Sequence, residues 1–321
     1  MTGLDLAISR RRWLLGVGAL IGSARVSARQ TDPPEGVSDP LDVIRRRADE
    51  VGLPGFRVRE GMRYTVIGSA SDRFIAGALR LCEGLADDYL DHFAGRGFAV
   101  EAPKERMVMV ALDDRDAFSR FVGVEQPPEV TGIFEVGPNY LVLYDGRNGG
   151  PAGPTAERAN SLTLFHEAMH QLTFNTGLLH RDADIPLAVS EGLATYGEVR
   201  RPGGRGEVGD LNWERLAVIL SALSQRRPLI PLADLIGGDH PFQKEETVQL
   251  AYAQSWLFVF GLIRNDQATE RFRAYLEALR DVERPRPRVE LAEEHLGDLA
   301  RLDAMLPQFA ARLSRSREPI R

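Results

Sequence analysis

Cysteine is nearly absent from this sequence, and neither sign of charge dominates it. Cys82 is the single cysteine among 321 residues, so the chain can form no internal disulfide and no metal centre built on several thiolates. The 40 basic and 46 acidic residues give a formal net charge of -6, which lacks the positive footprint of a nucleic-acid-binding protein. We therefore expect no nucleic-acid partner, and any bound metal must be held by histidine and carboxylate side chains.

Long hydrophobic runs are also missing. The apolar run at residues 13–22 is about 10 residues long, whereas a permanent transmembrane helix needs roughly 20. Three arginines at residues 10–12 precede this run and small residues at 26–28 follow it, which resembles a twin-arginine export signal with a cleavage site. We predict a signal peptide at residues 1–28, export by the twin-arginine translocation machinery to the periplasm or extracellular space, and no permanent membrane anchor. The alternative is a basic amphipathic helix or an unstructured arm.

The remaining chain has enough apolar residues to build a large core, since the sequence is 43% hydrophobic overall. Residues 30–40 are rich in Pro, Asp, Gly and Ser, which predicts a tether with the folded part beginning soon after it; we assign 29–55 to a linker or N-terminal segment and 56–315 to a single domain. Strand and helix patterns are mixed in its first half, about 56–150, and almost only helical in its second half, about 155–315. This order favours an α+β fold with a small mixed β-sheet.

The elements of the first half follow from local patterns. Turn formers at residues 136–139 separate two runs that favour β-structure, which predicts a hairpin. We expect strands at 62–69, 106–112, 132–135 and 140–144, and helices at 72–93 and 115–122.

Two histidines stand four positions apart in the first segment of the helical half. At 3.6 residues per turn, His166 and His170 lie on one face of a helix, about 5 to 6 Å apart at Cβ, so both imidazoles can reach one ion. Glu167 is turned about 100° from His166, which suits contact with a metal-bound water better than shared ligation. The alternative is a pair of structural histidines satisfied by backbone carbonyls or acids.

A second helix, expected at residues 185–200, brings a carboxylate. Glu191 follows His170 by 21 residues, which allows one helix to end and a second to return beside it. Gly192 costs about 1 kcal/mol relative to Ala inside a helix, so we expect it to permit close approach of a neighbouring helix. Glu191 can serve as a third metal ligand only if this second helix lies close to the helix that carries the two histidines.

The motifs HEAMH at 166–170 and SEGLATY at 190–196 resemble those of the gluzincin metallopeptidases, and most closely the exported peptidase-MA-like proteins. The resemblance covers residues 132 to about 262 and implies a zincin-like fold that holds one Zn²⁺ per chain. Matched by position, the general base is Glu167, and the three metal ligands are His166, His170 and Glu191.

Three further assignments stay open from the sequence. Glu198, one heptad after Glu191, is a rival third ligand, and His180 is a weaker one. Tyr252 is placed like the tyrosine of aminopeptidase N-like enzymes that donates a hydrogen bond to the tetrahedral oxyanion, although a buried core aromatic is the alternative. The strand at 140–144 is expected either to pair with an extended peptide at the sheet edge or to be an ordinary core strand.

These features predict a zinc-dependent hydrolase that cleaves peptide bonds in a peptide or protein substrate, with a metal-activated water and Glu167 as general base. A hydrolase of non-peptide bonds is one alternative. The other is a non-catalytic metal-binding or protein-binding module of the cell envelope. The presence of Glu167 favours catalysis, because binding alone needs only the metal ligands.

Overall fold

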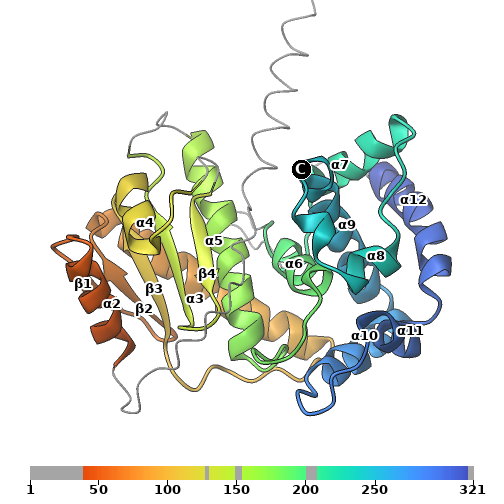
Figure 1. Ribbon diagram of the computed structural model, residues 1–321, viewed down its shortest axis with the longest axis horizontal. Helices are drawn as coiled ribbons and strands as arrows, with labels where there is room; N and C mark the ends of the chain where they lie inside the picture. Colours follow the sequence, from red (N-terminus) through yellow and green to blue (C-terminus); the bar gives the residue numbers. More distant parts are fainter. Residues whose placement is uncertain (1–38, 127–129, 149–153, 200–207, 317–321) are drawn as a thin grey trace, which may run out of the picture. The chain divides into compact units, whose positions relative to one another are not determined.

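The computed structural model describes residues 39–126, 130–148, 154–199 and 208–316, and these confirm the α+β class with a mainly helical C-terminal half (Figure 1). The chain divides into two compact units, one formed by Met1–Asp87 with Pro103–Gln171 and one by Asp88–Ala102 with Leu172–Arg321. The export signal expected at residues 1–28 lies outside the described residues.

The first unit contains a mixed five-stranded sheet with the order β1-β2-β3-β5-β4. The two outer pairs, β1–β2 and β4–β5, are antiparallel, and the inner pairs β2–β3 and β3–β5 are parallel. β1 was not expected, because its sequence RVRE has a single apolar residue and so no apolar face to signal a strand; all four residues are exposed in the structure. The strands are β1 (Arg57–Glu60), β2 (Tyr64–Gly68), β3 (Met107–Leu112), β4 (Gly132–Glu135) and β5 (Tyr140–Tyr144).

The predicted hairpin is present, and its position corrects one expectation. β4 and β5 have the predicted bounds, and Asn139 in the turn between them has a φ of 58°. β5 is bonded on both sides, to β3 and to β4, so the prediction that residues 140–144 pair with a peptide at the sheet edge is wrong. The strand at that edge of the sheet is β4.

One face of the sheet is covered by α2 (Pro40–Glu50) and α4 (Arg115–Val122). Ile44 and Ala48 of α2 and Phe118 of α4 pack in the same buried cluster as alternate residues of the strands. Arg47 of α2 also donates hydrogen bonds to two backbone carbonyls at the end of α4. Residues 40–50, within the range 29–55 assigned to a linker or N-terminal segment, are therefore packed on the sheet, because the apolar face of α2 covers strand residues.

The opposite face of the sheet meets α3 (Asp72–Gly95) and α5 (Pro154–Asn175). Glu83 of α3 accepts hydrogen bonds from the backbone N–H groups of Arg63 and Tyr64 at the start of β2. Gln171 of α5 donates to the backbone oxygens of Val108 in β3 and Asn139 in the hairpin turn. These bonds set the position of both helices relative to the strands.

The second unit is organised around α9 (Glu245–Ile263), whose residues from Leu250 to Phe260 are all buried. Such burial is typical of a helix that is surrounded by other elements. α6 makes the most extensive contact with it, and α7, α10, α12 and η1 also pack against it. The other elements of this unit are α6 (Leu187–Tyr196), α7 (Trp213–Ser224), α8 (Leu232–Gly237), η1 (His240–Phe242), α10 (Asp266–Leu279), α11 (Arg288–Leu296) and α12 (Leu299–Arg315).

Across the described part of the chain, no helix combines the length and the apolar character needed to cross a bilayer.

Candidate metal centre

The two histidines of the HEAMH motif lie on α5, and their rings face each other. Their Nε2 atoms are 3.2 Å apart, close to the roughly 3.4 Å that separates two ligand atoms bound to a tetrahedral zinc ion at about 2.1 Å each. His166 and His170 are 1% and 9% exposed. The geometry expected from the four-residue spacing is therefore present, and both imidazoles are removed from solvent.

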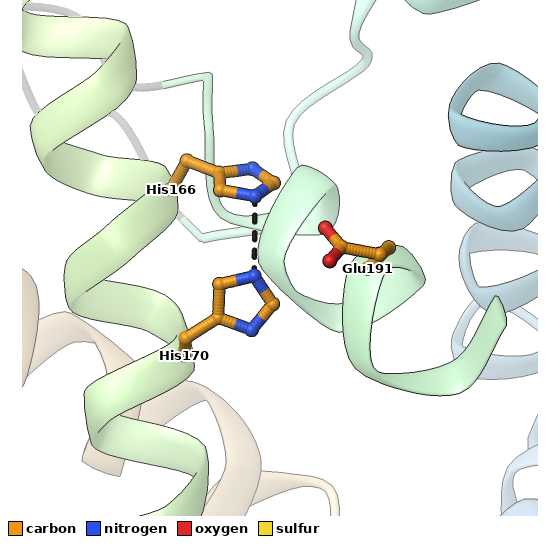
Figure 2. Close-up of side chains that lie close together, drawn as sticks. All are labelled: His166, His170 and Glu191. Atoms are coloured by element: carbon orange, nitrogen blue, oxygen red, sulfur yellow. Dashed lines mark hydrogen bonds between the residues drawn. The ribbon is translucent and has the colours of Figure 1, made fainter. Parts of the chain in front are cut away.

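Glu191 completes the group from α6. One ligand atom each of His166, His170 and Glu191 lies within 4.8 Å of the other two, and all three residues are buried. Figure 2 shows the carboxylate of Glu191 directed toward the two imidazoles. Two imidazoles and one carboxylate fit the donor set of a catalytic zinc site, so this group could hold a metal ion.

The rival ligand Glu198 has a different environment. α6 ends at Tyr196, so Glu198 lies beyond the helix, which is shorter than the expected 185–200. Its carboxylate accepts hydrogen bonds from Arg215 and Asn212. The buried metal-capable group includes Glu191 and neither Glu198 nor His180, whose side chain is 51% exposed.

Glu167 is buried on α5 and lies against the edge strand. It is 7% exposed, and a Cβ added to Gly132 of β4 would approach its Cγ to 3.5 Å and the Cγ2 of Thr163 to 2.9 Å. A side chain at position 132 would therefore crowd α5 beside Glu167. The glycine lets the edge strand pass close to this carboxylate.

Gln171 follows the second histidine and has no counterpart in the sequence predictions. Its side chain is fully buried, and its amide donates to Val108 O and Asn139 O at 3.1 Å each. These bonds fix α5 to the sheet directly next to His170. The available signal was a glutamine directly after the second histidine in a segment expected to be buried, because a buried amide must find hydrogen-bond partners.

Gly192 permits a close helix contact, as expected, but the helix that it contacts is α9. A Cβ at this position would lie 2.5 Å from Val259 Cγ2 and 2.7 Å from Ser255 O. The missing side chain therefore lets α6 pack tightly on α9. Thr195, one turn along α6, donates its hydroxyl to the carbonyl of Glu191 at 2.6 Å.

Tyr252 is a buried residue of α9, with 1% exposure. Its ring meets Phe242 edge-on at 5.5 Å, and the guanidinium of Arg215 lies 5.5 Å from its centroid. Tyr252 thus has the surroundings of a core aromatic on one side and a buried cation on the other. Arg215 was not singled out from the sequence, because a single arginine in an amphipathic helix gives no distinguishing signal.

The metal-capable residues fall within a segment that is similar to a known family. Residues 160–285 match the model of a family described as a protein of unknown function (DUF1570). No curated protein matches the chain. The similarity spans α5, α6 and α9, and it therefore covers the elements that carry His166, His170, Glu191 and Tyr252.

Proposed function

We propose that this protein is a zinc-dependent peptidase of the gluzincin type, with His166, His170 and Glu191 as metal ligands and Glu167 as general base. The observation that carries the proposal is the buried group of two imidazoles and one carboxylate, beside a second buried carboxylate on the same helix as the histidines. A site that only stored a metal would need the three ligands and no adjacent acid.

Zinc is the ion that this donor set suits best. Neutral imidazoles and a carboxylate are common zinc ligands, and three protein ligands leave one coordination position open. When bound, zinc would act as a Lewis acid and lower the pKa of a bound water toward about 7. The protein would contribute the fixed positions of its ligands and the low-dielectric surroundings.

Glu167 would act as the general base and then as the general acid. It follows His166 directly, so its side chain leaves α5 about 100° away from the ligand face. From there it would take a proton from the attacking water and later deliver it to the leaving amine. Tyr252 would donate a hydrogen bond to the oxyanion that develops on the substrate carbonyl.

A peptide is the substrate class that the neighbouring strand favours. β4 is the edge strand, and Gly132 lies close to Glu167. An extended peptide added along such an edge would form main-chain hydrogen bonds and pass near the general base. We therefore expect a peptide substrate to pair with β4 and not with residues 140–144.

A paired measurement tests the proposal. The zinc content of wild type and Glu167→Gln would be determined by elemental analysis, and both proteins would be incubated with a broad peptide library. We expect one zinc per chain in both, and a rate loss of about 10²-fold or more in the variant, since general-base catalysis contributes about 10²–10⁴-fold.

The remaining outcomes separate the alternatives. Equal cleavage by both proteins would remove Glu167 from the mechanism. Zinc binding without cleavage by either protein would support a metal-binding or protein-binding module instead. Turnover of ester or glycosidic substrates alone would support a hydrolase of non-peptide bonds.

A further inference from the structure

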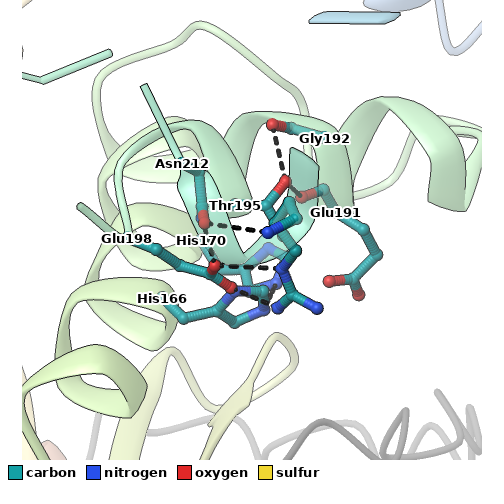
Figure 3. A network of polar contacts seen from close by, with 8 residues as sticks. His166, His170, Glu191, Gly192, Thr195, Glu198 and Asn212 are labelled. Atoms are coloured by element: carbon teal, nitrogen blue, oxygen red, sulfur yellow. Dashed lines mark hydrogen bonds and ion pairs between the residues drawn. The ribbon is translucent and has the colours of Figure 1, made fainter. Parts of the chain in front are cut away.

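A buried ion pair lies beside the third metal ligand and has no part in the function proposed so far. Arg215 donates from Nε to Glu198 Oε2 at 3.1 Å and from Nη2 to Glu198 Oε1 at 2.7 Å. The two side chains are 9% and 7% exposed. Asn212 adds a third bond to the carboxylate at 2.9 Å, and Figure 3 shows Glu198 and Asn212 together with Glu191.

The pair joins the end of the ligand helix to the start of the next helix. Glu198 lies two residues beyond the end of α6, and Arg215 lies in the first turn of α7. Asn212 is the N-cap of α7: its side-chain oxygen accepts from the backbone N–H of Arg215, while its side-chain amide donates to Glu198. The chain that leaves α6 is thereby held against α7.

Arg215 also faces the two residues expected to act at the metal. Its guanidinium lies 5.5 Å from the ring centroid of Tyr252. Burial alone would lower the pKa of Arg215, but the neighbouring Glu198, Tyr252 and Glu191 outweigh it and raise the pKa. Glu191 is thus one of the groups whose charge favours the protonated guanidinium, and Glu198 ties this guanidinium to the end of the helix that carries Glu191.

Stability gives no sufficient reason for an ion pair in this position. Removing two charges from water is costly, and an apolar pair of similar volume is often as stabilising or more so. A bidentate arginine–carboxylate pair differs from an apolar pair in fixing direction and distance. Such a pair suits a place where a neighbouring group must be held in one orientation.

We propose that Arg215, locked by Glu198 and Asn212, is a positioning residue of the metal centre that holds the carboxylate of Glu191 and the ring of Tyr252 in place. The proposal rests on the metal-binding part of the proposed function and not on peptide cleavage. Groups that orient metal ligands typically change metal affinity 10- to 100-fold when mutated.

The test uses the full chain and replaces the pair as a unit. The double variant Glu198→Met/Arg215→Met removes both charges together, so no uncompensated charge stays buried. Apo-protein stability is measured by urea unfolding, and zinc affinity by competition with a chromogenic chelator. The absorption spectrum of the cobalt-substituted protein reports the ligand geometry. The exposed pair Arg286–Glu294 supplies the control, Arg286→Met/Glu294→Met.

We expect the double variant to unfold at a similar urea concentration to wild type, to bind zinc about 10- to 100-fold more weakly, and to show an altered cobalt spectrum. The control variant should match wild type in all three measurements. Native zinc affinity and a native cobalt spectrum in the folded double variant would overturn the proposal and leave the pair as a structural contact.

A second variant decides the question if the double variant does not fold. Arg215→Lys keeps the positive charge but loses the bidentate geometry, and we expect weaker zinc binding from it as well; unchanged affinity would overturn the proposal. A wild-type protein that binds no zinc would overturn both this proposal and the proposed function. Zinc binding with equal cleavage by wild type and Glu167→Gln would overturn only the peptidase proposal.

Discussion

At the scale of single residues, the composition of the metal-capable group depends on which of two nearby glutamates has its carboxylate close to the two histidines. Glu191 lies in α6, and Glu198 lies seven residues later, two residues beyond the end of that helix; both are buried. Glu191 joins the two histidines, whereas Glu198 is neutralised by Arg215. The two carboxylates therefore have different surroundings, and we expect their removal to have different effects.

Glu191→Ala and Glu198→Ala should be distinguishable by metal content and by stability. We expect Glu191→Ala to lower the zinc affinity by well over 100-fold, because mutation of a group that only supports a ligand lowers metal affinity by about 10- to 100-fold. Glu198→Ala leaves the charge of Arg215 buried without its partner, which should lower the free energy of unfolding by about 3–5 kcal/mol. Equilibrium dialysis and urea unfolding of the two variants check this. Loss of zinc from Glu198→Ala alone would reverse the ligand assignment.

We expect the contribution of His92 to the free energy of unfolding to depend on pH in the acid range. Burial, with added repulsion from Arg96 and Arg264, lowers the pKa of His92 from 6.5 to about 3. Its Nε2 lies 2.9 Å from the hydroxyl oxygen of Tyr196, the last residue of α6. Because the unfolded chain takes up the proton first, the stabilisation is complete above pH 6.5 and is lost as the pH falls toward 3.

The corresponding variant is His92→Gln, which cannot titrate in this range. Relative to the variant, wild type should lose at most about 1.4 kcal/mol of unfolding free energy per pH unit within that window. Urea unfolding at several pH values measures the difference. Parallel pH profiles for the two proteins would show that His92 is already protonated in the folded state or is accessible to solvent.

At the scale of secondary structure, the contact between α6 and α9 depends on Gly192. In an open helix, Gly→Ala stabilises by about 1 kcal/mol. At position 192, however, the new methyl group would meet Val259 and the backbone of Ser255 at less than 3 Å. Gly192→Ala should therefore destabilise the fold, whereas the same substitution in an open helix stabilises it.

We expect Gly192→Ala to lower the free energy of unfolding by about 1–3 kcal/mol, as overpacked core substitutions do. Gly77 in α3 is a matched control, because a Cβ there would meet nothing closer than an Arg80 side-chain nitrogen at 4.0 Å. Gly77→Ala should stabilise by up to about 1 kcal/mol. Chemical denaturation of both variants measures the contrast, and equal effects at the two positions would contradict the close packing at Gly192.

Most elements of the sheet-containing unit follow from the sequence. The hairpin strands and α4 have the expected bounds, since their turn residues and apolar alternation are local signals. In the second unit, α6 ends four residues earlier than expected because Gly197 follows Tyr196 and caps the helix. α2 was missed because its apolar residues Ile44 and Ala48 are sparse among charged ones, and only their packing on the strands makes the helix part of the core.

At the scale of the whole molecule, metal binding should be coupled to folding. A ligand that binds only the folded state adds about 4 kcal/mol to the unfolding free energy at a free concentration of about 1,000 times its Kd. We expect zinc to raise the thermal unfolding midpoint and a chelator to reverse the rise. His166→Ala should not respond to zinc. An equal response in this variant would place the bound zinc elsewhere on the protein.

The sequence by itself determined which kinds of side chain could form the candidate site. The four-residue spacing of His166 and His170 is a property of any α-helix, and the lack of cysteine limits the ligands to imidazoles and carboxylates. The α+β class also followed from the order of local patterns along the chain.

Only the tertiary structure decided which strand lies at the sheet edge, which glutamate joins the histidines, and which helix Gly192 approaches. Each of these depends on contacts between segments far apart in the sequence. Local propensity and spacing describe a residue and its near neighbours along the chain, so they contain no information about which distant segment will pack against it.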